Sequence, residues 1–296
     1  MNLRPRLFPT LLLAMTAPLP AATFGDDLAF LKNHTEVIVL SDDSGASQVA
    51  IVPAWQGRIM TSTAGGTGGF SYGWVNRGLI ATGKFQRHIN TFGGEDRFWL
   101  GPESGQFSLF FAPGAAFDLD HWNTPAAIDT EPYAVTAQSA DRVVCSRAIA
   151  LTNFSGTRFQ LEVTREIRLL RASDALAARG LQLPAGTSAV AFESRNTVSN
   201  SGRETWRKDT GLVSIWILGM FNASPASTVV IPYAAGAGPI VNDSYFGKVP
   251  ADRLVAKDGV IFFRADSLHR GKIGVPPPRA KPLLGSYRFR VARDIA

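Results

Sequence analysis

Cysteine is almost absent from this chain of 296 residues. Cys145 is the only one, so no disulfide can form within the chain, and stability has to come from a large packed core. The residues around it, Arg-Val-Val-Cys-Ser-Arg, alternate like a strand. This pattern favours a small buried core residue over a reactive nucleophile.

Charged side chains are also scarce, at 18% of the residues, whereas apolar ones make up 45%. This composition excludes intrinsic disorder and a collagen-like or coiled-coil fibre. The formal charge of +6 is small and scattered along the sequence, which argues against nucleic acid as a partner. The 28 glycines and 18 prolines predict many turns and few long helices.

Long hydrophobic runs are missing, because no segment reaches the ~20 apolar residues that a membrane-spanning helix needs. The N-terminus has basic residues at positions 4 and 6, an apolar stretch over 7–17 and two small residues at 21 and 22. This is the pattern of a secretory signal peptide. We therefore expect residues 1–22 to be removed, and the mature chain to be periplasmic or secreted without stable membrane insertion.

Known metal and phosphate patterns are absent too. The four histidines show no metal-ligand spacing and have no cysteine partner. The glycine run at 65–69 lacks the following Lys-Ser/Thr of a phosphate loop, and no Gly-x-Ser-x-Gly elbow occurs. The sequence thus predicts neither a metal nor a cofactor.

The sequence does contain a long series of short β patterns separated by turn signals. One helix is expected soon after the leader, where Asp26 and Asp27 suit a first turn, and a short one at 171–179. No repeat and no linker is visible, so we expect a single domain over 23–296, built as a large antiparallel sandwich. The expected strands are 37–40, 49–52, 58–63, 106–111, 134–138, 143–152, 159–169, 188–199, 211–221, 228–232, 260–263 and 286–291.

The densest group of chemically able side chains lies between two glycine turns, at 93–94 and at 101–102. An extended chain between them would place Glu95, Arg97 and Trp99 on one face and Asp96 on the other. A carboxylate, a guanidinium and an indole suit the binding of sugar hydroxyls and a sugar face. The same residues equally suit an internal carboxylate–arginine pair beneath a packed tryptophan, and the local pattern does not separate the two.

Catalytic residues are not assigned by the sequence, but there are three candidates: His88, Glu95 and Glu103. His88 has the side chain of a general acid or base. Arg97, Trp99 and Asp96, together with His121 and Trp122 from a second polar-aromatic loop, are the candidate substrate-binding residues.

Two later segments add expectations. Residues 192–221 read as a hairpin whose second arm is deeply buried. Residues 243–253 are polar, aromatic and turn-rich, which suits either a cover over a cleft or an ordinary exposed loop.

The segments 57–63, 88–90, 93–103, 211–221 and 245–250 resemble a bacterial family of uncharacterised secreted proteins related to galactose mutarotases (aldose 1-epimerase-like). The resemblance covers roughly residues 36 to 285. It implies an all-β supersandwich of two or more large antiparallel sheets, with carbohydrate bound on a concave face. It also implies that the C-terminal part of that fold is missing here, since chains of the family continue through further strands.

Mutarotases use a histidine general acid and a glutamate general base near the C-terminus, and neither matches a residue here securely. The expected function is therefore carbohydrate binding in the cell envelope. A carbohydrate-active enzyme, an aldose epimerase or a polysaccharide lyase-like protein using a carboxylate/histidine pair, is the alternative. A third hypothesis gives the 93–103 motif only a stabilising role. The sequence decides neither the sugar nor the oligomeric state.

Overall fold

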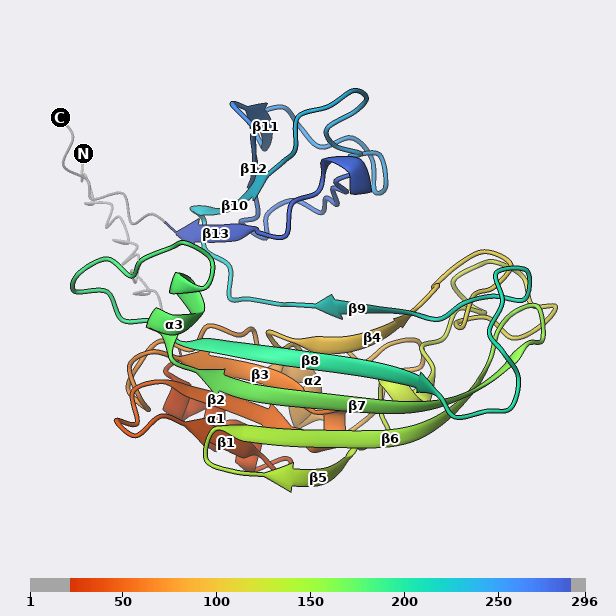
Figure 1. The fold of residues 1–296 in the computed structure, drawn as a ribbon, viewed down its shortest axis with the longest axis horizontal. Coiled ribbons are helices and arrows are strands. Elements are labelled where there is room, and N and C mark those ends of the chain that lie inside the picture. The colour runs from red at the N-terminus through yellow and green to blue at the C-terminus, as the bar shows by residue number, and fades with distance from the viewer. Residues whose placement is uncertain (1–21, 289–296) are drawn as a thin grey trace, which may run out of the picture. The chain divides into compact units, whose positions relative to one another are not determined.

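The computed structural model describes residues 22–288. The chain divides into two compact units, one ending at Met220 and the other beginning at Phe221 (Figure 1). Antiparallel strands dominate the described residues, with three short α-helices, so the β-rich expectation is confirmed. The predicted signal peptide lies outside the described residues apart from Ala22, and the single domain over 23–296 stays a prediction.

The first layer of the N-terminal unit is built from two antiparallel ladders, β1-β2-β3 and β4-β9. Backbone hydrogen bonds in both directions between Ile59 and Asp96 join β3 to the start of β4. The strands of this layer are β1 (Ile38–Ser41), β2 (Gln48–Val52), β3 (Arg58–Thr63), β4 (Arg97–Gly101) and β9 (Ser214–Leu218).

The second layer is a meander in which each strand pairs with the next one along the chain. On β7 the odd-numbered residues from Phe159 to Leu169 are buried, while the even-numbered ones between them are more exposed. This period of two is what an antiparallel sheet with one face on the core requires. The strands are β5 (Ala134–Gln138), β6 (Arg142–Thr152), β7 (Arg158–Leu170) and β8 (Ala191–Asn200).

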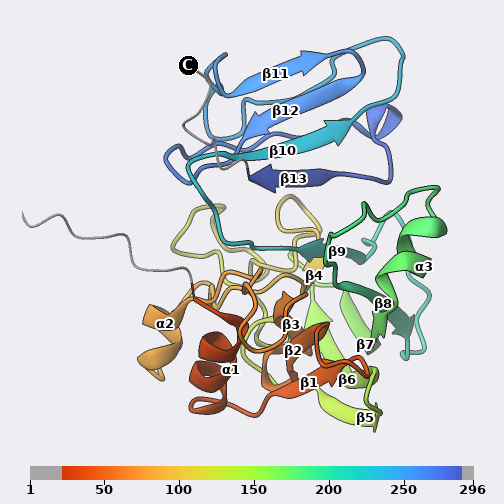
Figure 2. The ribbon, with the colours of Figure 1, turned by 90° about the vertical axis from the view of Figure 1, so that its left-hand side faces the viewer.

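The two layers enclose one hydrophobic core. Leu40, Ile59 and Phe98 from the first layer belong to the same buried cluster as Val163 and Cys145 from the second. Figure 2 shows the orange strands β1–β3 beside the green strands β6 and β7. The N-terminal unit is therefore an antiparallel β-sandwich. Cys145 is buried in it, as expected.

Helices cover the other side of the first layer. The N-cap of α1 (Phe24–Lys32) is Thr23, whose side chain forms a capping box with Asp26, as the acidic first turn predicted. α2 (Arg77–Ala81) begins at Asn76, which caps the helix through Leu79 N–H. Leu31, Leu79 and Met60 of β3 belong to a second buried cluster. α3 (Ala172–Ala177) follows β7, near the predicted position.

The C-terminal unit has its own four-stranded antiparallel sheet, in the order β11-β12-β10-β13. Ile261 of β12 is fully buried there, and Val249 is nearly so. The strands are β10 (Ser227–Pro232), β11 (Leu254–Lys257), β12 (Val260–Arg264) and β13 (Gly285–Arg288). Three 3-10 turns complete the described elements: η1 (Pro53–Trp55), η2 (Ala126–Ile128) and η3 (Pro277–Arg279).

Two predicted features are wrong. Residues 106–111 form turns and bends instead of a strand. The expected hairpin at 192–221 does not form, because β8 pairs with β7 and β9 pairs with β4. The second arm is not deeply buried either: Ile215, Trp216 and Ile217 of β9 are each 38–39% exposed. An apolar strand without local alternation carries no information about which distant strand it joins.

Candidate functional site

The glycine turn before β4 is required by close approach of the backbone. Gly94 has φ 110°, and a Cβ there would lie 2.8 Å from the carbonyl oxygen of Ile59. Gly93 has φ 98°, and a Cβ there would lie 2.0 Å from the carbonyl oxygen of Trp74. Only glycine fits both positions, and this packing aims the following strand into the sandwich.

The predicted alternation holds for Arg97 and Trp99, whereas Glu95, expected on the same face, contacts Ser62 of β3. The guanidinium carbon of Arg97 lies 4.2 Å from the centre of the Trp99 ring, so these two side chains share a face. Arg97 Nη2 donates to Asp129 Oδ1 at 2.8 Å, and its Nη1 donates to the carbonyl of Asn90 at 3.3 Å. Burial lowers the pKa of Arg97 to about 10, which still leaves it charged at neutral pH.

We call residues 95–100 the strip. On its other face, side chains connect the two layers of the sandwich. The Asp96 carboxylate pairs with Arg165 of β7 and accepts a 2.6 Å hydrogen bond from Ser194 Oγ of β8. Arg165 lies over the ring of Phe98, with its guanidinium carbon 5.4 Å from the ring centre. It also donates to the carbonyl of Gln56 at 3.1 Å.

Glu95 lies in a separate buried environment beside β3. Its carboxylate accepts hydrogen bonds from the backbone N–H of Ser62 at 2.6 Å and from the Ser62 hydroxyl at 2.9 Å. Burial raises the pKa of Glu95 from 4.5 to about 7, against the opposing effect of these hydrogen bonds. Such a carboxyl can hold a proton near neutrality, and only 7% of the Glu95 surface is exposed.

These contacts correct the expectation that the strip faces an open groove. Arg97 is 0% exposed, Trp99 2%, Asp96 6% and Glu95 7%. Arg97 pairs with Asp129 and Asp96 with Arg165, while Glu95 is hydrogen-bonded to Ser62. A carboxylate–arginine pair beneath a packed tryptophan, the other reading of the same residues, describes the observed contacts. Arg97 and Trp99 have almost no surface left for contact with a bound sugar, and Asp96 and Glu95 have little.

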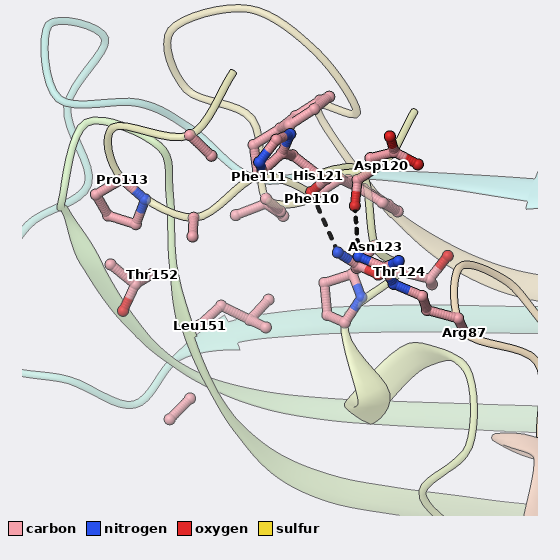
Figure 3. Close-up of a pocket in the computed structure, with 15 residues that line it drawn as sticks. Arg87, Phe110, Phe111, Pro113, Asp120, His121, Asn123, Thr124, Leu151 and Thr152 are labelled. Carbon is pink, nitrogen blue, oxygen red and sulfur yellow. Dashed lines mark hydrogen bonds between the residues drawn. The ribbon is translucent and has the colours of Figure 1, made fainter. Parts of the chain in front are cut away.

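A pocket does open next to this strip, in the loop that follows β4 (Figure 3). It has a volume of about 530 Å³, within the range of small-molecule sites. Its walls come from residues 109–115, from residues 120–125 and from the end of β6. Arg87 closes one side.

Planar polar side chains line the rim of this pocket. Arg87 Nη2 donates to the carbonyl of Asp120 at 2.9 Å, which ties two loops together. Asn123 Nδ2 donates to the carbonyl of His121 at 3.2 Å. His121 Nδ1 lies 2.5 Å from Asp118 Oδ1, and this hydrogen bond lowers the pKa of the Asp118 carboxyl. An aspartate on Nδ1 leaves the other ring nitrogen free to work as an acid or a base.

An aromatic stack connects the buried strip to the pocket wall. Phe110, a lining residue, stacks on Trp99 with ring centres 5.4 Å apart and on Trp122 with ring centres 5.3 Å apart. Arg97 lies over the same Trp99 ring. The strip therefore supports the wall of the pocket without lining it.

The remaining candidates lie outside the pocket lining. His88 is half-buried, and its Nδ1 is hydrogen-bonded to the carbonyl of Trp122 at 2.7 Å. Glu103 is also half-buried; its charge acts on Arg97, and its carbonyl accepts a hydrogen bond from Ser108 at 2.7 Å. Trp122 packs behind Phe110. His88, Glu95 and Glu103 are thus not brought together, and His121 alone of the predicted site residues lines the pocket.

Sequence reasoning missed Arg87, Phe110 and Asn123 as lining residues. Arg87 and Asn123 are sequence neighbours of His88 and Trp122, which were singled out, so a wider reading of both loops would have included them. Phe110 carried no signal, because 106–111 was taken for a strand.

A second hollow lies on the strands β5, β6 and β7, with a volume of about 570 Å³. Arg147 there is already bound to Glu131 and to the carbonyl of Pro132. In residues 22–288 no cluster of three or more His, Cys, Asp and Glu side chains could hold a metal ion. No helix in this range is long and apolar enough to cross a membrane.

The N-terminal unit is thus an antiparallel β-sandwich with a pocket formed by the loops after β4 and the end of β6. Residues 22–292 match a family of unknown function (DUF6786), so the chain belongs to that family. No curated protein matches the chain, and no solved structure does.

Proposed function

We propose that the protein binds carbohydrate in the pocket between residues 109–125 and the end of β6. The observation that carries this proposal is the combination of planar polar side chains on the rim with an apolar wall that a stack of aromatic rings supports from behind. Sugar rings present hydroxyls at their edges and apolar C–H groups on their faces, so they need both kinds of contact.

Each lining group has a distinct task in this proposal. Arg87 and Asn123 donate hydrogen bonds to ring hydroxyls, and His121 donates or accepts according to its tautomer. Ala112, Pro113 and Leu151 supply the apolar wall, and the buried rings of Phe110 and Phe111 lie behind it. The Trp99–Phe110–Trp122 stack keeps that wall rigid, which limits the entropy lost when a ligand binds.

The test is a screen of the full chain against immobilised glycans, followed by calorimetry with each sugar that binds. Asn123→Ala and Arg87→Ala should each weaken binding roughly tenfold, the value of one or two lost hydrogen bonds. Arg158→Ala is the matched control, since Arg158 is an exposed arginine outside the pocket. Absence of glycan binding, or equal losses in all three variants, contradicts the proposal.

An acid–base enzyme is the second candidate, favoured by the Asp118–His121 hydrogen bond at the pocket edge. The oriented imidazole would move a proton to or from a sugar hydroxyl or ring oxygen, as an aldose epimerase or a lyase requires. Optical rotation of anomerically pure hexoses measures the epimerase reaction. Acceleration over buffer that is lost in His121→Ala and reduced in Asp118→Asn supports catalysis, and no acceleration rejects this version.

We propose further that the sandwich is related to the galactose mutarotase-like supersandwich. Two observations support the relationship: large antiparallel layers packed on one core, and the motif 93–103 at the start of β4. An experimental structure of this protein, superimposed on a galactose mutarotase, tests it. The same strand order in both layers is expected, and a different order would contradict the relationship.

The location in the cell follows from the predicted signal peptide. We propose a periplasmic or secreted protein, with cleavage near residue 22. The family match begins at residue 22, as expected if the leader is not part of the family's fold. Mass spectrometry of the protein from its native host tests this, since an intact N-terminus in a cytosolic fraction would exclude it.

A further inference from the structure

The described residues of the two units carry opposite net charge. Residues 221–288 contain nine lysines and arginines against four aspartates, a net of +5. Residues 22–220 contain seventeen basic and nineteen acidic residues, a net of −2. The basic character therefore belongs to the C-terminal unit, where it does not follow from the pocket or its proposed ligand.

Part of this charge is neutralised within the unit. Asp266 forms ion pairs with two arginines. Its Oδ1 lies 2.8 Å from Arg253 Nη1, and its Oδ2 lies 2.9 Å from Arg264 Nε. Lys257 lies 3.9 Å from Asp258. By contrast, Lys248, Arg270 and Lys272 form no ion pair with any residue of the described range 22–288, and all three are exposed.

These three cations lie on two loops that adjoin each other. The loops 242–249 and 267–274 are joined by two backbone hydrogen bonds of 2.8 Å between Asn242 and Gly274. Lys272 Nζ lies 4.0 Å from the centre of the Tyr245 ring, and the guanidinium carbon of Arg270 lies 4.4 Å from that of Phe246. Asp243, half-buried, is the single acidic residue in the two loops.

Apolar side chains project from the same two loops. Tyr245 is 63% exposed, Phe246 48%, and Leu268 75%. We call the surface formed by Tyr245, Phe246, Lys248, Leu268, Arg270 and Lys272 the basic–apolar patch. It combines exposed aromatic and aliphatic groups with unpaired positive charge, as surfaces that lie on anionic membranes do.

The geometry of the patch argues against single-stranded nucleic acid and acidic sugars as its ligands. The Tyr245 and Phe246 rings meet at 86°, with centres 4.7 Å apart, so they do not form parallel platforms for successive bases. One face of each ring already carries a cation. Leu268 offers neither a hydrogen bond nor a ring face to a sugar, but an aliphatic group at a loop tip suits the boundary between headgroups and acyl chains.

We propose that the basic–apolar patch docks the protein on the surface of a bilayer that contains anionic phospholipids. The cations contact the phosphates, while Phe246 and Leu268 enter the interface to a shallow depth. This is reversible adsorption without a spanning segment, and it does not depend on the proposed sugar site.

The experiment is co-sedimentation of the full chain with vesicles of phosphatidylcholine alone or with added phosphatidylglycerol. Binding should require the anionic lipid and should fall as salt rises. Arg270→Ala/Lys272→Ala should weaken it on the order of 25-fold, because each basic residue near such a surface contributes about fivefold. Arg158→Ala/Lys208→Ala removes the same charge from exposed positions of the N-terminal unit and should have little effect.

A second variant separates lipid from other polyanions. Leu268→Ser leaves the charge unchanged and should weaken vesicle binding roughly tenfold, from the lost burial of one leucine. Circular dichroism verifies that each variant is folded. The proposal would be overturned by binding without preference for anionic vesicles, or by equal losses in the charge-matched control. It would also be overturned if soluble acidic glycan or single-stranded DNA outcompeted the vesicles and bound Leu268→Ser equally well.

Discussion

Arg97 lies over the indole of Trp99, two residues further along the same strand, with 4.2 Å between the guanidinium carbon and the ring centre. Phe110 of the pocket wall stacks on that indole. The two residues that the sequence offered as direct sugar ligands therefore form the support behind the pocket. Their chemistry is used inside the protein, where burial strengthens cation–π and ionic contacts.

The Arg97–Asp129 pair should be strongly coupled in stability. Arg97→Met or Asp129→Asn alone leaves one buried charge uncompensated and should lower the free energy of unfolding by about 3–5 kcal/mol. The double variant should lose less than the sum by about 1–3 kcal/mol, measured by urea unfolding. The exposed Arg195–Glu193 pair, at 4.0 Å, is the control and should show coupling below about 0.5 kcal/mol. Equal coupling in both pairs would contradict this.

Sequence patterns predicted the helices and strands that are determined by neighbouring residues. β3 falls at the predicted residues, and β7 was found because its alternation is regular over thirteen residues. α1 was found from its acidic first turn. The pairing of β9 with β4 joins segments more than a hundred residues apart, and no periodicity in either strand records it.

The candidate site shows the same boundary. Alternation predicted that Arg97 and Trp99 share a face, but Glu95, expected with them, contacts Ser62 instead. Whether that face meets water depended on Asp129 and Arg165, which lie 32 and 69 residues from their partners Arg97 and Asp96. A carboxylate beside an arginine looks identical in sequence whether its partner is a sugar or the core, so burial was decided by the tertiary fold.

Gly94 should be far less tolerant of substitution than another glycine with positive φ. Gly94→Ala places a methyl group 2.8 Å from the Ile59 carbonyl oxygen, at φ 110°. Because the obstacle is backbone, we expect a loss of more than about 3 kcal/mol, or no folded protein. Gly105→Ala, at φ 82° with nothing within 4 Å of the added carbon, should cost about 1 kcal/mol. Thermal unfolding of both variants tests this, and similar melting temperatures would refute the assigned role.

Glu95 should make the protein less stable as pH rises through the neutral range. Its folded-state pKa of about 7 lies above its ordinary value of 4.5. Between these values the unfolded chain releases the proton while the folded chain keeps it, so stability is complete below pH 4.5 and falls until about pH 7. The loss should be about 3 kcal/mol. Glu95→Gln should flatten the dependence in urea unfolding between pH 5 and 8. An unchanged slope in Glu95→Gln would assign the effect to another group.

Cys145 should be unreactive in the folded protein. It is fully buried, and burial raises the pKa of its thiol to about 11, so the thiolate is scarce at neutral pH. A thiol reagent at pH 8 should label the native chain only at the rate of unfolding, and should label it at once in urea. Fast labelling under native conditions would show that the core around β6 opens.

Trp99 should control sugar affinity although it is only 2% exposed. Trp99→Leu removes the ring against which Phe110 stacks, so the pocket wall loses its fixed position and ligand affinity should fall several-fold. Calorimetry with a sugar that binds the unmodified chain measures the change. Ile167→Ala is the control for stability: this fully buried residue lies on β7 outside the pocket lining, and its loss should cost 2–5 kcal/mol without changing affinity. If both variants weaken binding equally, Trp99 acts only through global stability, and the stack is not what positions the site.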